Sequence, residues 1–209
     1  MASRESSPII ILGLSDYRES SLIVRGLTPA FGQIDFVVRG ARSIKARSFP
    51  VIDLFRIIRG EFPEQGGGLR PLYNVELLFR NDAIALDPEG YTTACRCALF
   101  VTRNSPADIS QPVLFAAVKQ CFNAISGRSV SGFSWLTLLQ LVFLYEQGLL
   151  PDMSSVSGDD TPEGAYTRQL IGAAASPDVS FPPFDKEYWS VFSDWVASLC
   201  AYHGVAQPG

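Results

Sequence analysis

The residues best suited to chemistry are four cations that follow one another closely in the first quarter of the chain. They are Arg39, Arg42, Lys45 and Arg47. No Asp or Glu occurs from Phe36 to Ile52, so the segment holds no carboxylate that could neutralise them. Cationic side chains at this spacing can contact successive phosphates of a nucleic acid, and each contact releases condensed counterions. The same charges would also keep a surface loop soluble, and the pattern alone leaves both interpretations open.

Aromatic side chains near this basic segment could stack on nucleic-acid bases. They are Tyr17, Phe31, Phe36 and Phe49. The alternative is that the three phenylalanines belong mostly to the core of the domain that carries the segment. Any binding of this kind would read phosphates and exposed bases rather than a particular sequence.

Catalysis and metal binding find little support. The single histidine, His203, precedes Gly204 near the end of the chain, where a solvent-exposed histidine at a helix end is the ordinary interpretation. No nucleophile elbow, phosphate loop or dinucleotide fingerprint is present. Cys95 and Cys97 are two residues apart on a predicted helix, so they point to different faces and cannot chelate one ion together. We therefore expect no enzymatic activity, no cofactor, no metal and no small-molecule substrate.

Composition indicates a soluble globular protein. Of the 209 residues 47% are hydrophobic and 18% are charged, which is enough apolar material for a core. The net charge of −4 is uneven, because residues 1–80 carry a net +3 and residues 81–209 a net −7. Such asymmetry predicts two modules with different partners. Acidity elsewhere does not exclude a local basic patch, since exposed charges more than about 8 Å apart are largely screened.

The location of the protein is predicted from its first residues and its cysteines. The apolar run at residues 8–14 is too short for a signal peptide or a membrane span. Four cysteines lie in apolar, helical surroundings at no spacing that suggests disulfides. We therefore expect a cytoplasmic protein that does not associate with a membrane.

The elements that must position the basic segment are predicted to be short strands. Five runs rich in Ile, Val, Leu and Phe are separated by turn residues, at 9–14, 22–27, 34–38, 54–58 and 72–79. Five short strands in a domain of residues 1–80 suit a small barrel, which leaves few exposed sheet edges. An OB-fold and an SH3-like barrel would both fit this count.

From residue 81 onward the pattern predicts an all-α domain. Helices are expected at 89–103, 112–125, 133–147, 165–175 and 186–202. The third is apolar nearly all round, which is typical of a central, buried helix, and Gly148 ends it. Asp185 is the expected N-cap of the last helix. The apolar face of that helix is predicted to carry Tyr188, Phe192, Trp195 and Leu199.

Two stretches of the chain resemble the bacterial DNA repair protein RecO family. The first comprises residues 17–24, 27–32, 36–42 and 45–48, and includes the basic Gly40-Ala41-Arg42 element. The second comprises residues 133–139 and 145–152, similar to the central helix of the family and the Gly-x-x-Pro turn that follows it. The order of the two stretches and the length of the chain also fit.

The resemblance implies an α+β protein with an OB-fold followed by a helical domain, and no enzymatic activity. Family members bind single- and double-stranded DNA, anneal complementary strands and pair with RecR. They help to load the RecA recombinase onto DNA coated with single-strand binding protein, and some contact the acidic, apolar tail of that protein. By position, the resemblance assigns DNA contact to Arg39 and Arg42, with Lys45 and Arg47 just beyond.

The chain departs from the family pattern in one respect that concerns metal. Many members carry a four-cysteine zinc module after the Gly-x-x-Pro turn, whereas residues 153–166 contain neither Cys nor His. We therefore expect the zinc module to be absent. Two functions remain, a recombination mediator that binds DNA through the barrel, and a protein-interaction adaptor with an OB-fold but little DNA binding.

Overall fold

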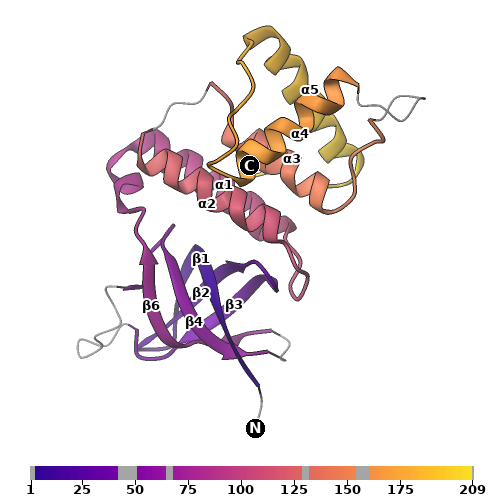
Figure 1. Ribbon diagram of the computed structural model, residues 1–209. Helices are drawn as coiled ribbons and strands as arrows, with labels where there is room; N and C mark the ends of the chain where they lie inside the picture. Colours follow the sequence, from indigo (N-terminus) through magenta and orange to yellow (C-terminus); the bar gives the residue numbers. More distant parts are fainter. Residues whose placement is uncertain (1–2, 42–50, 65–67, 129–131, 154–160, 209) are drawn as a thin grey trace.

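The computed structural model describes residues 3–41, 51–64, 68–128, 132–153 and 161–208 (Figure 1). Within these residues six strands come first: β1 (Arg4–Tyr17), β2 (Ser21–Thr28), β3 (Gly32–Val38), β4 (Ile57–Pro63), β5 (Arg70–Pro71) and β6 (Tyr73–Phe79). The helices that follow are the 3-10 helix η2 (Asp82–Leu86) and α1 (Pro88–Asn104), α2 (Pro112–Ser126), α3 (Trp135–Glu146), α4 (Pro162–Ala175) and α5 (Lys186–Tyr202). The predicted α+β class is confirmed. In the described part of the chain, no helix has the length and apolarity needed to span a bilayer.

The strands form one curled sheet with the order β5-β3-β2-β1-β4-β6. Only Leu72 separates β5 from β6, so these two behave as a single bent strand. One end of that strand pairs parallel with β3 and the other pairs antiparallel with β4. The two edges of the sheet are thereby joined by the same stretch of chain. This closure is that of the OB-fold, and the strand count differs from the predicted five only because the last strand bends at Leu72.

The prediction of a strand at 54–58 is wrong in its position, because β4 begins only at Ile57. Phe55 lies before it in a turn and has a φ of +63°, a left-handed conformation that is uncommon for a bulky residue. Its ring leaves the barrel and packs among the helices, 5.0 Å from the ring of Phe122 and 5.8 Å from that of Tyr91. Packing between distant segments therefore overrides the local preference for a strand.

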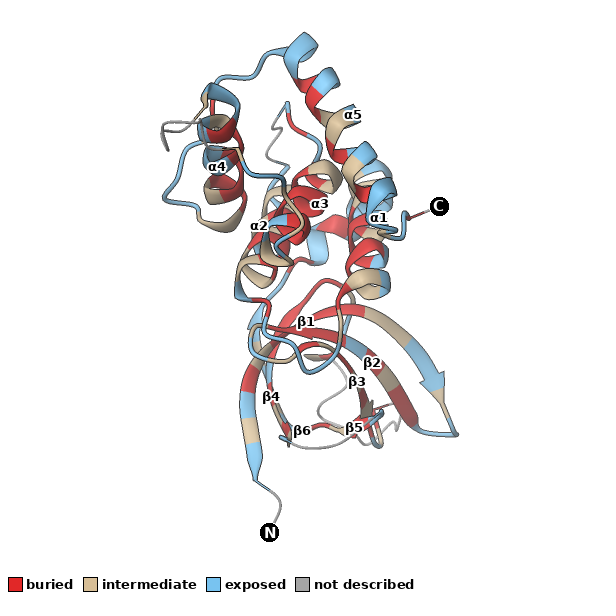
Figure 2. Ribbon diagram, turned by 90° about the vertical axis from the view of Figure 1, so that its right-hand side faces the viewer, coloured by how far each residue is buried: buried red, intermediate tan, exposed pale blue. Residues whose placement is uncertain are grey.

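Two apolar cores hold the molecule together, and the larger one joins the barrel to the helices. The smaller core fills the barrel around Phe36 and Phe62. The larger core contains the buried faces of the helices together with five barrel residues, Ile10, Leu12, Leu27, Phe55 and Ile57. Figure 2 shows this buried layer between the helices and the sheet, where α1 contacts β1 and α2 contacts β2. The helices thus cover one end of the barrel rather than forming a separate body.

Helix α3 lies at the centre of the helical part, as its apolar sequence predicted. Ser134 caps its start by accepting a hydrogen bond from the backbone N–H of Thr137, and Gly148 beyond its end has a φ of +67°. Its last residue, Glu146, accepts hydrogen bonds from the backbone N–H groups of Val113 and Leu114 at 2.8 and 2.9 Å. This carboxylate therefore satisfies donors at the start of α2 that have no partner within their own helix.

Helix α5 has the predicted bounds, and Asp185 is its N-cap as expected. The predicted apolar face is wrong by about one residue. The buried stripe consists of Trp189, Phe192, Val196 and Cys200. The ring of Trp189 packs 4.9 Å from that of Phe133, and this contact turns Tyr188 toward solvent, where it is 39% exposed.

An ion pair joins the barrel to the first helical turn after it. Arg56 donates to Asp82 through Nε at 2.7 Å and through Nη2 at 2.9 Å. The hydrogen bond from Arg56 lowers the pKa of Asp82 below its ordinary value, although burial acts in the opposite direction. Because Asp82 remains 45% exposed, solvent screens the pair and limits its contribution to about 1 kcal/mol.

The ion pair of Arg56 with Asp82 should make the free energy of unfolding depend on pH. A carboxyl group whose pKa is lowered by folding stabilises the protein above its unfolded pKa of about 3.9, and this contribution is lost as the pH falls through the lowered folded value. The variant Asp82→Asn should therefore unfold at lower urea concentration than wild type at pH 7, and the difference should shrink below about pH 4. The exposed Asp194, changed to Asn, is the matched control and should show no such trend. A difference for Asp82→Asn that is constant with pH would contradict the assignment.

Candidate nucleic-acid interface

The candidate site begins where β3 ends. Arg39 is the residue after β3 and its side chain is exposed. The other three predicted DNA contacts, Arg42, Lys45 and Arg47, lie outside the described residues, as does Phe49. The structure therefore places one of the four predicted cations, on the surface and at the start of the basic segment.

The strand register brings a second cation to the same end of the barrel. Leu22 pairs with Val38, and Tyr17 pairs with Ser21, so the β1–β2 turn lies beside the end of β3. Arg18 occupies this turn, is exposed, and has its guanidinium 5.1 Å from the centre of the Tyr17 ring. We call Tyr17, Arg18 and Arg39 the basic end. Arg18 is absent from the predicted contacts, although pairing residues 9–14 with residues 22–27 would have brought it close to Arg39.

The basic end lies far from the acidic helices. Strand β2 runs from the basic end to the β2–β3 turn, which touches the α1–α2 connection. There the carbonyl of Pro29 accepts from the N–H of Gln111 at 2.8 Å, and that of Phe31 accepts from the N–H of Asp108 at 2.9 Å. The eight residues of β2 separate the two ends, a length of about 20 Å at about 3.3 Å for each step between residues. This exceeds two Debye lengths at physiological salt, so the helices neither cover nor neutralise the basic end.

Two of the aromatic candidates belong to the barrel core. Phe36 is fully buried and Phe31 is half-buried. Their rings lie 5.1 and 5.6 Å from the ring of Phe62. The core alternative therefore holds for both, and neither can stack on a base. Tyr17 remains the aromatic side chain described at the basic end.

The outer face of β2 and β3, which OB-folds commonly use to bind oligonucleotides, carries balanced charge. A hollow of about 310 Å³ lies there, and its lining includes Gln33, Asp35, Arg70 and Asp108. Gln33 donates to Asp35 at 2.7 Å, and Arg70, almost fully buried, donates to Asp108 at 2.5 Å. Arg25 pairs with Asp35 at 4.0 Å. Because the cations of this face have carboxylate partners, phosphate binding is favoured at the basic end instead.

The helical part has a hollow of its own between α2 and the α4–α5 connection. Its volume is about 700 Å³, and its lining includes Lys119, Gln120, Asn123, Val179 and Phe181. The side-chain oxygens of Gln120 and Asn123 are buried, and within the described part of the chain they have no hydrogen-bond partner. Such oxygens accept N–H donors, and Lys119 supplies a positive charge beside them. We call this the α2 hollow.

The remaining candidates for chemistry have structural explanations. Cys97, Cys121 and Cys200 are buried, and burial raises the pKa of the Cys121 thiol. His203 is the exposed C-cap of α5. In the part of the chain that the structure describes, no three His, Cys, Asp or Glu side chains come together as metal ligands would.

The first part of the chain is similar to a known protein family. Residues 1–80 match the family model described as recombination protein O N terminal, a range that ends one residue after β6. No curated protein matches the chain.

Proposed function

We propose that this protein is a non-enzymatic mediator of DNA recombination and repair, because residues 1–80 match the recombination protein O N-terminal family model. It binds single- and double-stranded DNA through the barrel and promotes annealing of complementary strands. With RecR as a partner, it helps to load the RecA recombinase onto DNA coated with single-strand binding protein. The single observation that carries this proposal is the exposed basic end, about 20 Å from the acidic helices.

The basic end explains how annealing can proceed without catalysis. Two DNA strands repel each other through their phosphates, and cations held on one surface reduce that repulsion by replacing condensed counterions. Arg18 and Arg39 supply such charges, and the segment after Arg39 adds Arg42, Lys45 and Arg47. Tyr17, half-buried beside Arg18, supplies a ring on which an unpaired base can stack. None of these contacts distinguishes one base sequence from another.

The α2 hollow is the place where the acidic, apolar tail of single-strand binding protein would bind. Lys119 attracts a carboxylate, and Val179 and Phe181 offer apolar contacts. The buried oxygens of Gln120 and Asn123 accept backbone N–H groups of an extended peptide. A fixed side chain supports this proposal, because Nε2 of Gln120 donates to the carbonyl of Ala173 at 2.6 Å.

A strand-annealing assay with bare DNA and with DNA coated by single-strand binding protein tests both parts of the proposal. Wild-type protein should accelerate annealing in both reactions. The variant Lys119→Glu should keep its rate on bare DNA and lose about tenfold on coated DNA, because it repels the acidic tail. Lys186→Glu is the matched control, because Lys186 is an exposed cation at the start of α5 that does not line the α2 hollow. Equal loss on bare and coated DNA would contradict the assignment of Lys119 to the tail.

The second candidate is an interaction adaptor whose barrel binds little DNA. The balanced charges on the outer face of β2 and β3 favour it, because that face offers phosphates no surplus of cations. A titration of labelled oligonucleotide at low salt, repeated with RecR present, distinguishes the two functions. Failure to bind in both cases would overturn the mediator and support the adaptor.

A further inference from the structure

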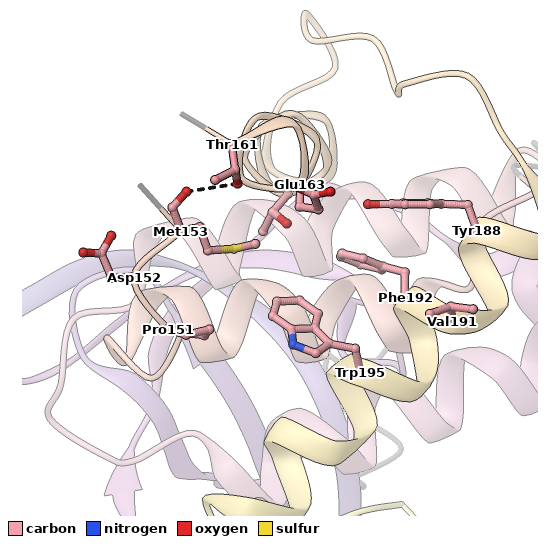
Figure 3. Close-up of a pocket in the computed structure, with 10 residues that line it drawn as sticks. Pro151, Asp152, Met153, Thr161, Glu163, Tyr188, Val191, Phe192 and Trp195 are labelled. Carbon is pink, nitrogen blue, oxygen red and sulfur yellow. Dashed lines mark hydrogen bonds between the residues drawn. The ribbon is translucent and has the colours of Figure 1, made fainter. Parts of the chain in front are cut away.

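A groove separate from the α2 hollow lies where α5 passes the start of α4. Its volume is about 470 Å³. Residues 151–153, which follow α3, form one wall, the first turns of α4 form a second, and α5 forms the third (Figure 3). Thr161 closes one corner, because its hydroxyl donates to the carbonyl of Met153 at 3.1 Å and accepts from the N–H of Gly164 at 3.0 Å. Hydrogen bonds therefore connect the wall at residues 151–153 to the start of α4 in the absence of a ligand.

The wall formed by α5 carries three neighbouring aromatic rings, those of Tyr188, Phe192 and Trp195. The ring of Phe192 lies 6.3 Å from that of Tyr188 and 5.4 Å from that of Trp195. Phe192 is nearly buried, but Tyr188 is 39% exposed and Val191 beside it is 71% exposed. Tyr188 and Val191 are available to a partner, because the face of α5 that enters the core is the one that carries Trp189.

Two carboxylates line the groove, those of Asp152 and Glu163, and among the described residues no Lys or Arg does. Figure 3 shows Glu163 and the hydroxyl of Tyr188 directed toward each other across the opening. Burial, and then the negative charge of Glu163, raise the pKa of Tyr188, as expected for this closeness. Glu163 has no ion-pair partner in the part of the chain that the structure describes. The groove therefore combines aromatic faces with the negative charge of Glu163.

One further polar group lies at the groove without a partner. Thr167, on the turn of α4 after Glu163, is 2% exposed and lines the groove. Its hydroxyl has no hydrogen-bond partner among the described residues. A buried hydroxyl left in this state costs free energy, and a ligand that enters the groove can satisfy it.

We propose that this groove docks a basic, apolar peptide segment of a partner protein, in which an Arg lies next to aliphatic side chains. The aliphatic side chains contact Val191 and Met153. The guanidinium reaches Glu163 and lies over the ring of Trp195. Arginine fits better than lysine, because its planar guanidinium both stacks on aromatic rings and binds a carboxylate through two N–H groups. The charge of the groove opposes an acidic peptide and DNA, so its partner differs in kind from those of the α2 hollow and the basic end.

Three blocked synthetic peptides of the same length test the proposal by calorimetry on the full chain. The first alternates Leu and Arg, the second alternates Leu and Glu, and the third alternates Ser and Arg. The Leu/Arg peptide should bind at least about tenfold more tightly than each of the others at low salt. If the acidic peptide binds equally well, the charge argument is overturned, and if the Ser/Arg peptide does, the groove is not the site.

Two variants at the groove make the test specific. Glu163→Lys should reverse the preference, so that the Leu/Glu peptide binds more tightly than the Leu/Arg peptide. Trp195→Ala should weaken the Leu/Arg peptide by about tenfold or more. The matched control is Glu187→Gln on α5, which removes an exposed charge that does not line the groove and should change nothing. An unchanged preference in Glu163→Lys would overturn the proposal.

A third variant separates the groove from the DNA role. Replacement of Arg39, Arg42 and Lys45 with Ala should leave the affinity for the Leu/Arg peptide unchanged, because none of the three lines the groove. Failure of peptide binding and failure of DNA binding are thus observed independently. Loss of peptide affinity in this variant would overturn the location of the site.

Discussion

Replacing Arg39, Arg42 and Lys45 together with Ala should weaken DNA binding on the order of 100-fold or more at about 50 mM salt. Each cation that neutralises a phosphate of duplex DNA steepens the dependence of log affinity on log salt by about 0.9. Loss of three contacts should therefore flatten that slope by about 2 to 3. The loss should be the same for unrelated DNA sequences, because phosphate contacts carry no sequence information. Fluorescence anisotropy with labelled oligonucleotides at several salt concentrations measures both quantities.

Two single variants show whether the effect belongs to the basic end. Arg18→Ala should flatten the slope by about 1, since Arg18 lies beside Arg39 in the β1–β2 turn. Arg59→Ala is the control, because Arg59 is a similarly exposed barrel cation that already faces Glu76 at 4.0 Å. An unchanged slope in the triple variant, or an equal effect of Arg59→Ala, would contradict the proposed interface.

Replacing Phe55 with Ala should lower the free energy of unfolding by about 3–5 kcal/mol, the usual cost of removing a buried phenylalanine. Phe55 is 3% exposed and contacts Phe122 and Tyr91, so its removal leaves a cavity between the barrel and the helices. Urea unfolding followed by far-ultraviolet circular dichroism measures the loss. Phe79→Ala is the matched control, since Phe79 is 45% exposed at the end of β6.

A second substitution at this position separates packing from backbone conformation. Phe55 has a φ of +63°, which costs residues other than glycine about 1–2 kcal/mol. The variant Phe55→Gly should therefore be at least as stable as Phe55→Ala, the reverse of their usual order. If Phe55→Ala is as stable as wild type, the packing role of Phe55 between barrel and helices is contradicted. If Phe55→Gly is less stable than Phe55→Ala, the cost assigned to the backbone conformation is contradicted.

These two predictions concern opposite ends of the barrel. The end that holds Phe55 and Leu27 is buried by helices, and the end that holds Arg18 and Arg39 is left free. Strand β2 connects them, with its last residues in the shared core and its first residues beside the basic end. The helices can therefore stabilise the barrel without covering the basic end.

The sequence by itself determined the types and the order of the elements. The change from strands to helices, the N-cap at Asp185 and the end of α3 before Gly148 follow from short-range rules, because each depends on residues within one or two turns. Charge spacing made Arg39 a candidate DNA contact, and this role stays a prediction, although the structure shows that Arg39 is exposed. The similarity of residues 1–80 to the recombination protein O N-terminal family was also readable from the sequence.

Only the tertiary structure decided which elements share a core and which surfaces remain. Phe55 lies outside its expected strand, and its ring packs against Phe122 of the helical core. The register of β1, β2 and β3 places Arg18 beside Arg39. Arg25 on β2 forms an ion pair with Asp35 on β3. The buried face of α5 is displaced by about one residue from the predicted face, so Tyr188 is exposed and lines the groove. Each outcome depends on contacts between residues far apart in the chain, whose free energies no local pattern encodes.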